Sequence, residues 1–227
     1  MYYTKYLIFI LFLITNCFFF VYSQDENQEE DVYAMVRPKH TFSLELGMPV
    51  SMKNNLFSEL MRGVINVSPY YHYNFQNNLS LGLGVNYNFF WVNHVLAPDP
   101  KNTGGIHTGG VFGKLGYEKY YTERFGTDIG VKFGYSNHYY FSDLNKAISS
   151  NPPVNSSTFF ESTIAFILTA DEVTSYRWIV GYAIQNYTFN PTMLGYKDES
   201  RFTNASTKSL TQFLTVGFGF SYYFNQR

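Results

Sequence analysis

The sequence is poor in charged residues and almost free of cysteine. Lys, Arg, Asp and Glu make up only 15% of its 227 residues, against about 25% in a typical soluble domain. The 16 basic and 17 acidic residues nearly cancel and form no basic block. Nothing in this charge pattern indicates a nucleic-acid partner.

The only long apolar run lies at the very start of the chain. Lys5 precedes an apolar stretch over 7–21, and Val21-Tyr22-Ser23 ends in a small residue. This pattern predicts a cleaved signal peptide over 1–23, because a spanning helix needs about 20 apolar residues. The alternative is an uncleaved membrane anchor. Cleavage would remove Cys17, the single cysteine, which excludes disulfides and thiolate chemistry from the remainder. Residues 24–38 are polar and acidic and predict a flexible lead-in.

Aromatic residues supply much of the apolar content after this point. They form 20% of the chain, with 21 Tyr and 23 Phe. In the segment 79–93, apolar side chains such as Leu81, Leu83 and Val85 alternate with Gly, Ser and Asn. A period of two predicts a strand with one apolar and one polar face. Its length reaches the roughly 9–11 residues that a strand needs to cross a membrane.

The same alternation recurs along the chain and predicts eight strands. Their ranges are 39–48, 64–75, 79–93, 107–121, 125–139, 158–169, 176–187 and 210–224. The links between them alternate in length. Three are tight turns, at 76–78, 122–124 and 171–175, and four are long and polar, at 49–62, 94–106, 142–157 and 190–209. Within the first long link, 56–61 could form one amphipathic helical turn, too short to bind a membrane.

Strict alternation of short and long links is typical of outer-membrane barrels, which have short periplasmic turns and longer extracellular loops. The sequence therefore predicts an all-β fold, an eight-stranded antiparallel up-and-down transmembrane β-barrel over 39–227. The lead-in at 24–38 would then be periplasmic. A soluble lipocalin-like barrel is the alternative, with its apolar face inward. The many rings would overfill so narrow an interior, whereas an outward apolar face suits lipid.

The outward aromatic residues also gather near the two ends of the predicted strands. Bands of this kind match the aromatic girdles of outer-membrane barrels at the two membrane interfaces. The predicted girdle comprises Tyr73, Phe75, Trp91, Tyr121, Phe125, Tyr135, Tyr139, Trp178, Tyr222 and Phe224.

On these features the chain resembles the small outer-membrane barrels of the OmpA/OmpX type, and more nearly the PorT-like group common in Bacteroidota. The resemblance covers 39–224. It is carried by the Gly/aromatic closing strand 216–224 (VGFGFSYYF) and by Gly82-Leu83-Gly84. It implies location in the cell outer membrane, contact with outer-membrane lipid, and insertion by the barrel-assembly machinery, which reads a closing aromatic residue. Residues 225–227 extend beyond that aromatic, Phe224, and so depart from the pattern.

The polar face carries seven charged residues that are predicted to point into the lumen. These are Glu45, Lys114, Glu118, Asp128, Lys132, Glu161 and Arg177. They could form a charged constriction in a pore, or a paired network that plugs the lumen. The plug is favoured, because eight strands leave little bore and unpaired charges in so small a space are costly.

The sequence does not specify the protein's task. The favoured interpretation is a structural or interaction protein, whose four long loops serve adhesion or an envelope or secretion complex through a protein or surface ligand. A small solute pore is the alternative. A lipid-modifying enzyme is a further alternative, with candidates near the long-loop rim at His94, His107, His138, Ser142 and Asp143. No catalytic, cofactor or metal motif is present, so no enzymatic activity, no cofactor and no metal are expected.

Overall fold

The computed structural model describes residues 38–95, 97, 102–148, 151–196 and 210–224. The predicted signal peptide at 1–23 lies outside the described residues, as does all of the predicted lead-in except Pro38. Eight strands carry the fold: β1 (His40–Lys53), β2 (Met61–Asn74), β3 (Leu79–Val92), β4 (Gly104–Tyr120), β5 (Phe125–Ser142), β6 (Val154–Thr169), β7 (Thr174–Thr188) and β8 (Leu210–Phe224). Three short helices join them: α2 (Asn55–Leu60), α3 (Asp143–Ile148) and the 3-10 helix η1 (Pro191–Leu194).

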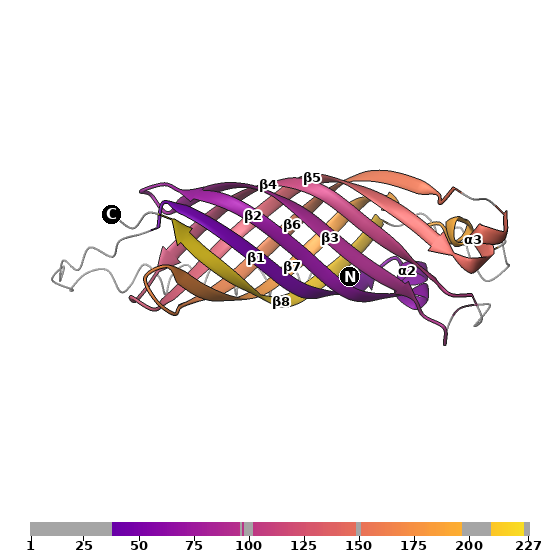
Figure 1. The fold of residues 1–227 in the computed structure, drawn as a ribbon, viewed down its shortest axis with the longest axis horizontal. Helices are drawn as coiled ribbons and strands as arrows, with labels where there is room; N and C mark the ends of the chain where they lie inside the picture. Colours follow the sequence, from indigo (N-terminus) through magenta and orange to yellow (C-terminus); the bar gives the residue numbers. More distant parts are fainter. Residues whose placement is uncertain (1–37, 96, 98–101, 149–150, 197–209, 225–227) are drawn as a thin grey trace, which may run out of the picture. The chain divides into compact units, whose positions relative to one another are not determined.

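The strands form a closed barrel in sequence order, with every neighbour antiparallel (Figure 1). Closure comes from β1 pairing with β8, where Leu44 lies opposite Phe220 and Leu46 opposite Phe218. A closed barrel leaves no unpaired sheet edge, so its backbone can lie in hydrocarbon. The predicted eight-stranded antiparallel barrel is thus confirmed.

Several strands are longer than the alternation predicted. β1 continues to Lys53 rather than ending at Met48, β5 continues to Ser142, and β6 begins at Val154 rather than Thr158. The long links predicted at 49–62, 94–106 and 142–157 are correspondingly shorter. The prediction was wrong here because it followed the side-chain pattern, whereas backbone pairing continues through polar stretches such as Asn155–Ser157.

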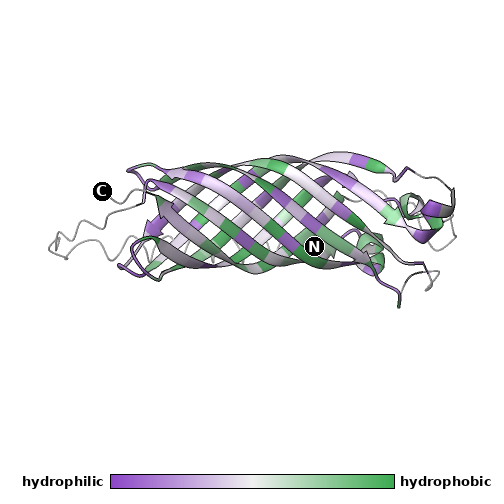
Figure 2. Ribbon diagram, in the orientation of Figure 1, coloured by the Kyte–Doolittle hydropathy of each residue, from purple (hydrophilic) through white to green (hydrophobic). Residues whose placement is uncertain are grey.

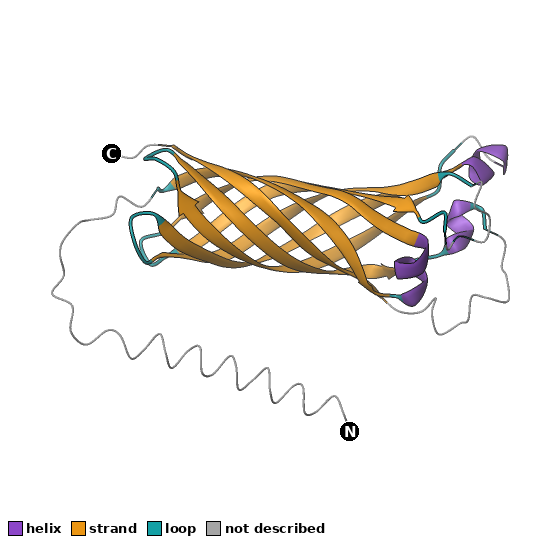
Figure 3. Cartoon of the chain, turned by 90° about the horizontal axis from the view of Figure 1, so that it is seen from below, coloured by secondary structure: helices purple, strands orange, loops and turns teal. Residues whose placement is uncertain are grey.

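The three helices lie at one end of the barrel, and the short turns lie at the other (Figure 3). α2 corresponds to the amphipathic helical turn that the sequence predicted at 56–61. Asn54 caps it by accepting a hydrogen bond from the Phe57 amide at 3.2 Å. None of the described helices is long and apolar enough to cross a membrane as a helix.

Side chains alternate between the outside and the lumen along most of the strand residues, so hydropathy changes residue by residue along the ribbons (Figure 2). β2 departs from this at a bulge, where Val64 and Ile65 are both exposed. On β3, Leu81, Leu83 and Val85 are exposed on the outer face, whereas Ser80 and Asn88 are buried. On β5, Ile129 and Phe133 point outward and Asp128 and Lys132 are buried. The apolar face is therefore outward, as predicted for a barrel in lipid, and the lipocalin-like alternative is excluded.

Candidate functional site

All seven predicted lumen charges are buried inside the barrel, and we call them the charge network. They come from strands β1, β4, β5, β6 and β7, each at an inward position of the alternation. None has more than 6% of its surface exposed, and Arg177 has none. Buried charges are tolerated only when they are paired and hydrogen-bonded.

Arg177 connects the two carboxylates nearest the short-turn end. Its guanidinium donates to Glu118 at 2.6 Å and to Asp128 at 2.7 Å. Glu118 also accepts a hydrogen bond from the Tyr120 hydroxyl at 2.8 Å, and His72 Nε2 lies 3.6 Å from it. The planar guanidinium suits this bridging role because its fixed N–H groups can serve two carboxylates at once.

Lys132 serves two further carboxylates, Glu45 at 2.7 Å and Glu161 at 3.6 Å. The two halves of the network meet at Tyr70. Its hydroxyl donates to Glu45 at 2.8 Å and accepts from Arg177 at 3.2 Å. It also accepts from Lys114 at 3.2 Å, and Lys114 in turn forms an ion pair with Asp128. One tyrosine therefore joins the pairs into a single network.

The register between β4 and β5 places like charges directly opposite each other. Lys114 faces Lys132, and Glu118 faces Asp128. Like charges at such positions repel, so neutralisation comes from the diagonal Lys114–Asp128 pair and from Arg177 across the lumen. This arrangement connects distant strands.

Glycines make room for these long side chains. A Cβ atom at Gly181 would lie 2.5 Å from Glu161 Oε1, and one at Gly116 would lie 2.6 Å from Ser80 Oγ and 3.0 Å from Asp128 Oδ1. The Gly-rich inward face is therefore the complement of the charges, because larger residues would fill their space.

Above the charge network, toward the helical end, the lumen contains uncharged polar groups. Asn66 donates to Asn88 at 2.7 Å. His138 Nε2 lies 2.8 Å from Ser157 Oγ, and Thr108 Oγ1 lies 2.9 Å from His138 Nδ1. This is a Ser–His pair whose third member is a hydroxyl rather than a carboxylate. The Tyr187 ring lies against the His138 ring, with their centroids 4.1 Å apart.

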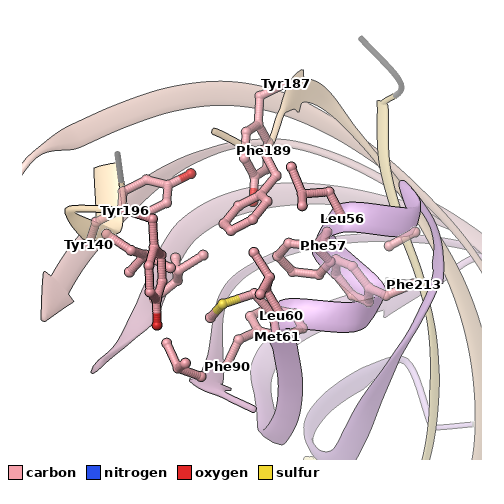
Figure 4. Close-up of a cluster of buried hydrophobic side chains, with 14 residues drawn as sticks. Leu56, Phe57, Leu60, Met61, Phe90, Tyr140, Tyr187, Phe189, Tyr196 and Phe213 are labelled. Atoms are coloured by element: carbon pink, nitrogen blue, oxygen red, sulfur yellow. The ribbon is translucent and has the colours of Figure 1, made fainter. Parts of the chain in front are cut away.

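At the helical end an apolar cluster closes the barrel mouth (Figure 4). This mouth cluster comprises Leu56, Phe57, Leu60, Met61, Phe90, Val92, Ile106, Tyr140, Ala183, Tyr187, Phe189, Leu194, Tyr196 and Phe213. The Phe57 ring from α2 packs edge-on against Phe90, with 5.0 Å between centroids, and against Phe189, at 5.3 Å. The first long link, predicted to be polar, therefore turns an apolar helix face into the lumen.

η1, which follows β7, is held by hydrogen bonds to the end of β5 and to α3. Ser142 Oγ donates to the Leu194 carbonyl at 2.7 Å, and Asn145 of α3 donates to the Met193 carbonyl. Gly195 ends η1 with a left-handed φ of 81°, which glycine adopts at little cost. The ends of three long links thus form one packed cap.

The sequence candidates for an enzyme site do not converge. His138 is buried beside Ser157, and Ser142 Oγ is occupied by η1. His107 is on the outer wall, where its ring stacks on Phe89. Asp143 is exposed, and hydrogen bonding from Thr103 lowers the pKa of its carboxyl below the usual value. Among the described residues, no group of three or more His, Cys, Asp or Glu could hold a metal ion.

The predicted girdle residues all lie on the outer face and are exposed or half-buried. Near the short-turn end, rings pair along single strands, as in Tyr73–Phe75 and Tyr222–Phe224, each with centroids 5.0 Å apart. Near the helical end, Trp91 contacts Phe89 at 5.7 Å between centroids. Rings at both ends of an apolar outer wall match the interfacial belts of membrane barrels.

Sequence reasoning missed the aromatic residues inside the lumen. Tyr70, Phe112 and Phe159 form a buried aromatic group beside the charge network, and Tyr223 is buried near the short-turn end. The alternation could have placed them in the lumen, because each lies two residues from an inward polar residue. Tyr70, for example, lies between Ser68 and His72.

Comparison with known proteins identifies the fold and no closer relationship. No family model matches the sequence, and no curated protein matches it. Among solved structures, Neisserial surface protein A aligns with a TM-score of 0.53 at 8% identity, covering 82% of this chain and 97% of that one. The outer-membrane protein OprG from Pseudomonas aeruginosa aligns with a TM-score of 0.50 at 15% identity, covering 84% and 99%.

The fold is therefore that of the small eight-stranded outer-membrane β-barrels. The closed barrel, the apolar outer wall and the two aromatic belts place the protein in the outer membrane. Membership of the PorT-like group stays a prediction.

Proposed function

We propose that this barrel is closed to solutes and acts through its extracellular surface, in adhesion or as a component of an envelope or secretion complex. The observation that carries the proposal is that the lumen is filled at two successive levels. The charge network occupies the level toward the short turns, and the mouth cluster occupies the helical end. Outer-membrane barrels place short turns in the periplasm, so the capped end faces outward.

The cap supports a binding role because its described helices, α2, α3 and η1, are held together by hydrogen bonds and packing. Hydrogen bonds join η1 to Ser142 and Asn145, and α2 presents Ser58 and Glu59 outward while burying Leu56 and Phe57. A preorganised surface loses less entropy on binding than loose loops do. The Ser157–His138 pair is assigned a structural role, because it lies beneath this cap and lacks an orienting carboxylate.

Planar-bilayer recording tests whether the barrel is closed. Wild-type protein should give no steady conductance, and neither should the double variant Phe57→Ala/Phe189→Ala, because the charge network below still fills the lumen. Phe133→Ala, which removes a ring from the outer wall, is the matched control. Large steady conductance from the wild-type protein would refute the closed barrel and favour the solute pore.

A complementation experiment tests where the function lies. In a deletion strain, replacing α3 with a Gly/Ser linker should abolish the surface adhesion or secretion that the wild-type gene restores. Replacing the turn residues 171–173 in the same way should leave it intact. Restored uptake of small solutes by both variants, with adhesion and secretion unchanged by the deletion, would contradict the proposal. A changed lipid A mass in the deletion strain would instead favour the enzyme.

A further inference from the structure

One group of side chains on the outer wall is not explained by the closed lumen or by the cap. We call it the outer aromatic patch: Phe89, Trp91, His94, His107 and Phe141, contributed by β3, the segment after it, β4 and β5. The rings of Phe89, His107 and Phe141 lie nearly parallel to one another and form a triangle. The His107 centroid lies 4.8 Å from that of Phe89 and 4.9 Å from that of Phe141, and the two phenylalanine centroids are 6.2 Å apart.

Polar groups border these rings. The Trp91 indole donates to His94 Nε2 at 3.0 Å, and His107 Nδ1 lies 2.7 Å from the Tyr87 hydroxyl. Arg62 of β2 is exposed and lies directly opposite Trp91 in the register. The patch therefore combines apolar rings with hydrogen-bonding edges, and the exposed Arg62 of the neighbouring strand lies beside it.

On β5, the patch residue Phe141 is separated from the apolar outer wall by a polar residue. Along the outer face of β5 the order toward the capped end is Phe133, Tyr135, Asn137, Tyr139 and Phe141. Asn137 is polar and bonds to Ser156 of β6, with Oδ1 and Oγ 2.7 Å apart. Asn137, Ser156 and the neighbouring Thr158 thus form a polar break in the outer wall.

We infer that this break marks the outer limit of the hydrocarbon on the β5–β6 side, because polar side chains are unfavourable there. Tyr139 and Phe141 lie beyond it along β5, which would place them at the level of the lipid head groups. Interfacial belts are richest in Trp and Tyr, whereas this patch groups the half-buried His107 ring with two phenylalanine rings. Its continuity with the lipid-facing wall identifies its occupant as part of a lipid of the outer leaflet.

We propose that the outer aromatic patch binds the saccharide head group of an anionic glycolipid in the outer leaflet. A sugar ring has an apolar C–H face that packs on aromatic faces and hydroxyl groups that bond to the surrounding polar atoms. Arg62 would pair with a phosphate or carboxylate on the head group. The acyl chains of the same lipid would lie along the apolar wall below the polar break.

The chain offers a built-in reporter for this binding. It has two tryptophans, of which Trp91 belongs to the patch and Trp178 lies on the outer wall of β7, 75% exposed. In a Trp178→Phe background, the emission of Trp91 can be followed while purified lipopolysaccharide is titrated into refolded protein. We expect a saturable change that requires at least tenfold more lipopolysaccharide in Phe141→Ala and in Arg62→Ala.

Phe133→Ala is the matched control, because it removes a ring from the outer face of the same strand below the polar break. It should bind lipopolysaccharide like the parent. A boiling-dependent gel shift would report whether Phe141→Ala folds. If it does not, Arg62→Ala still tests the proposal, because Arg62 is exposed and its replacement should not disturb folding. Equal affinity in Arg62→Ala and the parent would overturn the proposal.

Two further probes distinguish the source of the head group. An equal response to phosphatidylglycerol, an anionic lipid without sugar, would overturn the proposal in favour of an ordinary lipid belt. Equally tight binding of core oligosaccharide freed from its lipid would overturn the assignment to a membrane glycolipid, in favour of a soluble glycan. These results do not bear on whether the lumen is closed. Conversely, a conducting barrel would refute the proposed function without changing the lipopolysaccharide titration.

Discussion

Arg177→Met tests whether the charge network acts as one unit. The substitution keeps an apolar chain of similar length but removes the donors to Glu118 at 2.6 Å and to Asp128 at 2.7 Å. Asp128 retains Lys114, whereas Glu118 retains only the Tyr120 hydroxyl and His72. Removing one partner of a buried ion pair typically costs about 3–5 kcal/mol, because the other charge stays buried.

That loss would lower the folding equilibrium constant by about a thousandfold. Urea unfolding in lipid vesicles, followed by tryptophan emission, measures it. Arg62→Met is the matched control. It makes the same replacement at an exposed arginine and should change the free energy of unfolding by no more than about 0.5 kcal/mol.

The double variant Arg177→Met/Glu118→Gln identifies the cause of the loss. If the cost arises from the stranded carboxylate, neutralising Glu118 should make the double variant more stable than the sum of the two single effects by at least about 1 kcal/mol. Strictly additive effects, or a loss below about 1 kcal/mol in Arg177→Met, would refute the idea that ion pairing holds these strands together.

Three further predictions concern the barrel wall, a turn and the membrane fold. Gly217→Ala should destabilise the barrel by about 1–3 kcal/mol, because its Cβ would lie 2.1 Å from the Leu46 carbonyl oxygen. Gly109→Ala, with nothing within 4 Å, should be nearly neutral in the same urea assay. Hydrogen bonds from Thr174 and the Val173 amide lower the pKa of Asp171. Asp171→Ala should therefore unfold more readily than wild type above its unfolded pKa of about 3.9, and the difference should vanish as the pH falls through the lower folded value. Folded protein should migrate differently on gels before and after boiling, and a sample that stays soluble without detergent would contradict the barrel.

The period-two pattern was sufficient to predict the fold, because a barrel wall between lipid and a packed lumen imposes opposite requirements on alternate residues. Leu83 and Lys114 could be assigned to their faces from neighbours two positions away. The ends of the strands were harder to predict. Val50 and Met52 continue the outward face of β1, but Pro49 and Lys53 interrupt the pattern, and only pairing with β8 shows that the strand continues.

The interior was predictable in composition and not in connectivity. The seven charges could be placed in the lumen from parity alone, but their partners depend on the stagger of strands around the barrel. The sequence named no partner for any of the seven, and Arg177 reaches both Glu118 and Asp128 from β7. The mouth cluster could not be foreseen, because Phe57 and Phe189 lie in different links and meet only when the barrel closes.

The two levels that fill the lumen differ in what they depend on. The charge network comes from strand positions that the closed barrel fixes, and its ion pairs join strands that are not neighbours, such as β1 with β5 and β7 with β5. The mouth cluster is partly formed by α2 and η1, which belong to the links between strands. If the proposed function is right, changes in those links would remodel the cap while the charge network keeps the barrel closed below. The extracellular surface could then vary without opening a path across the membrane, as a surface-binding role requires.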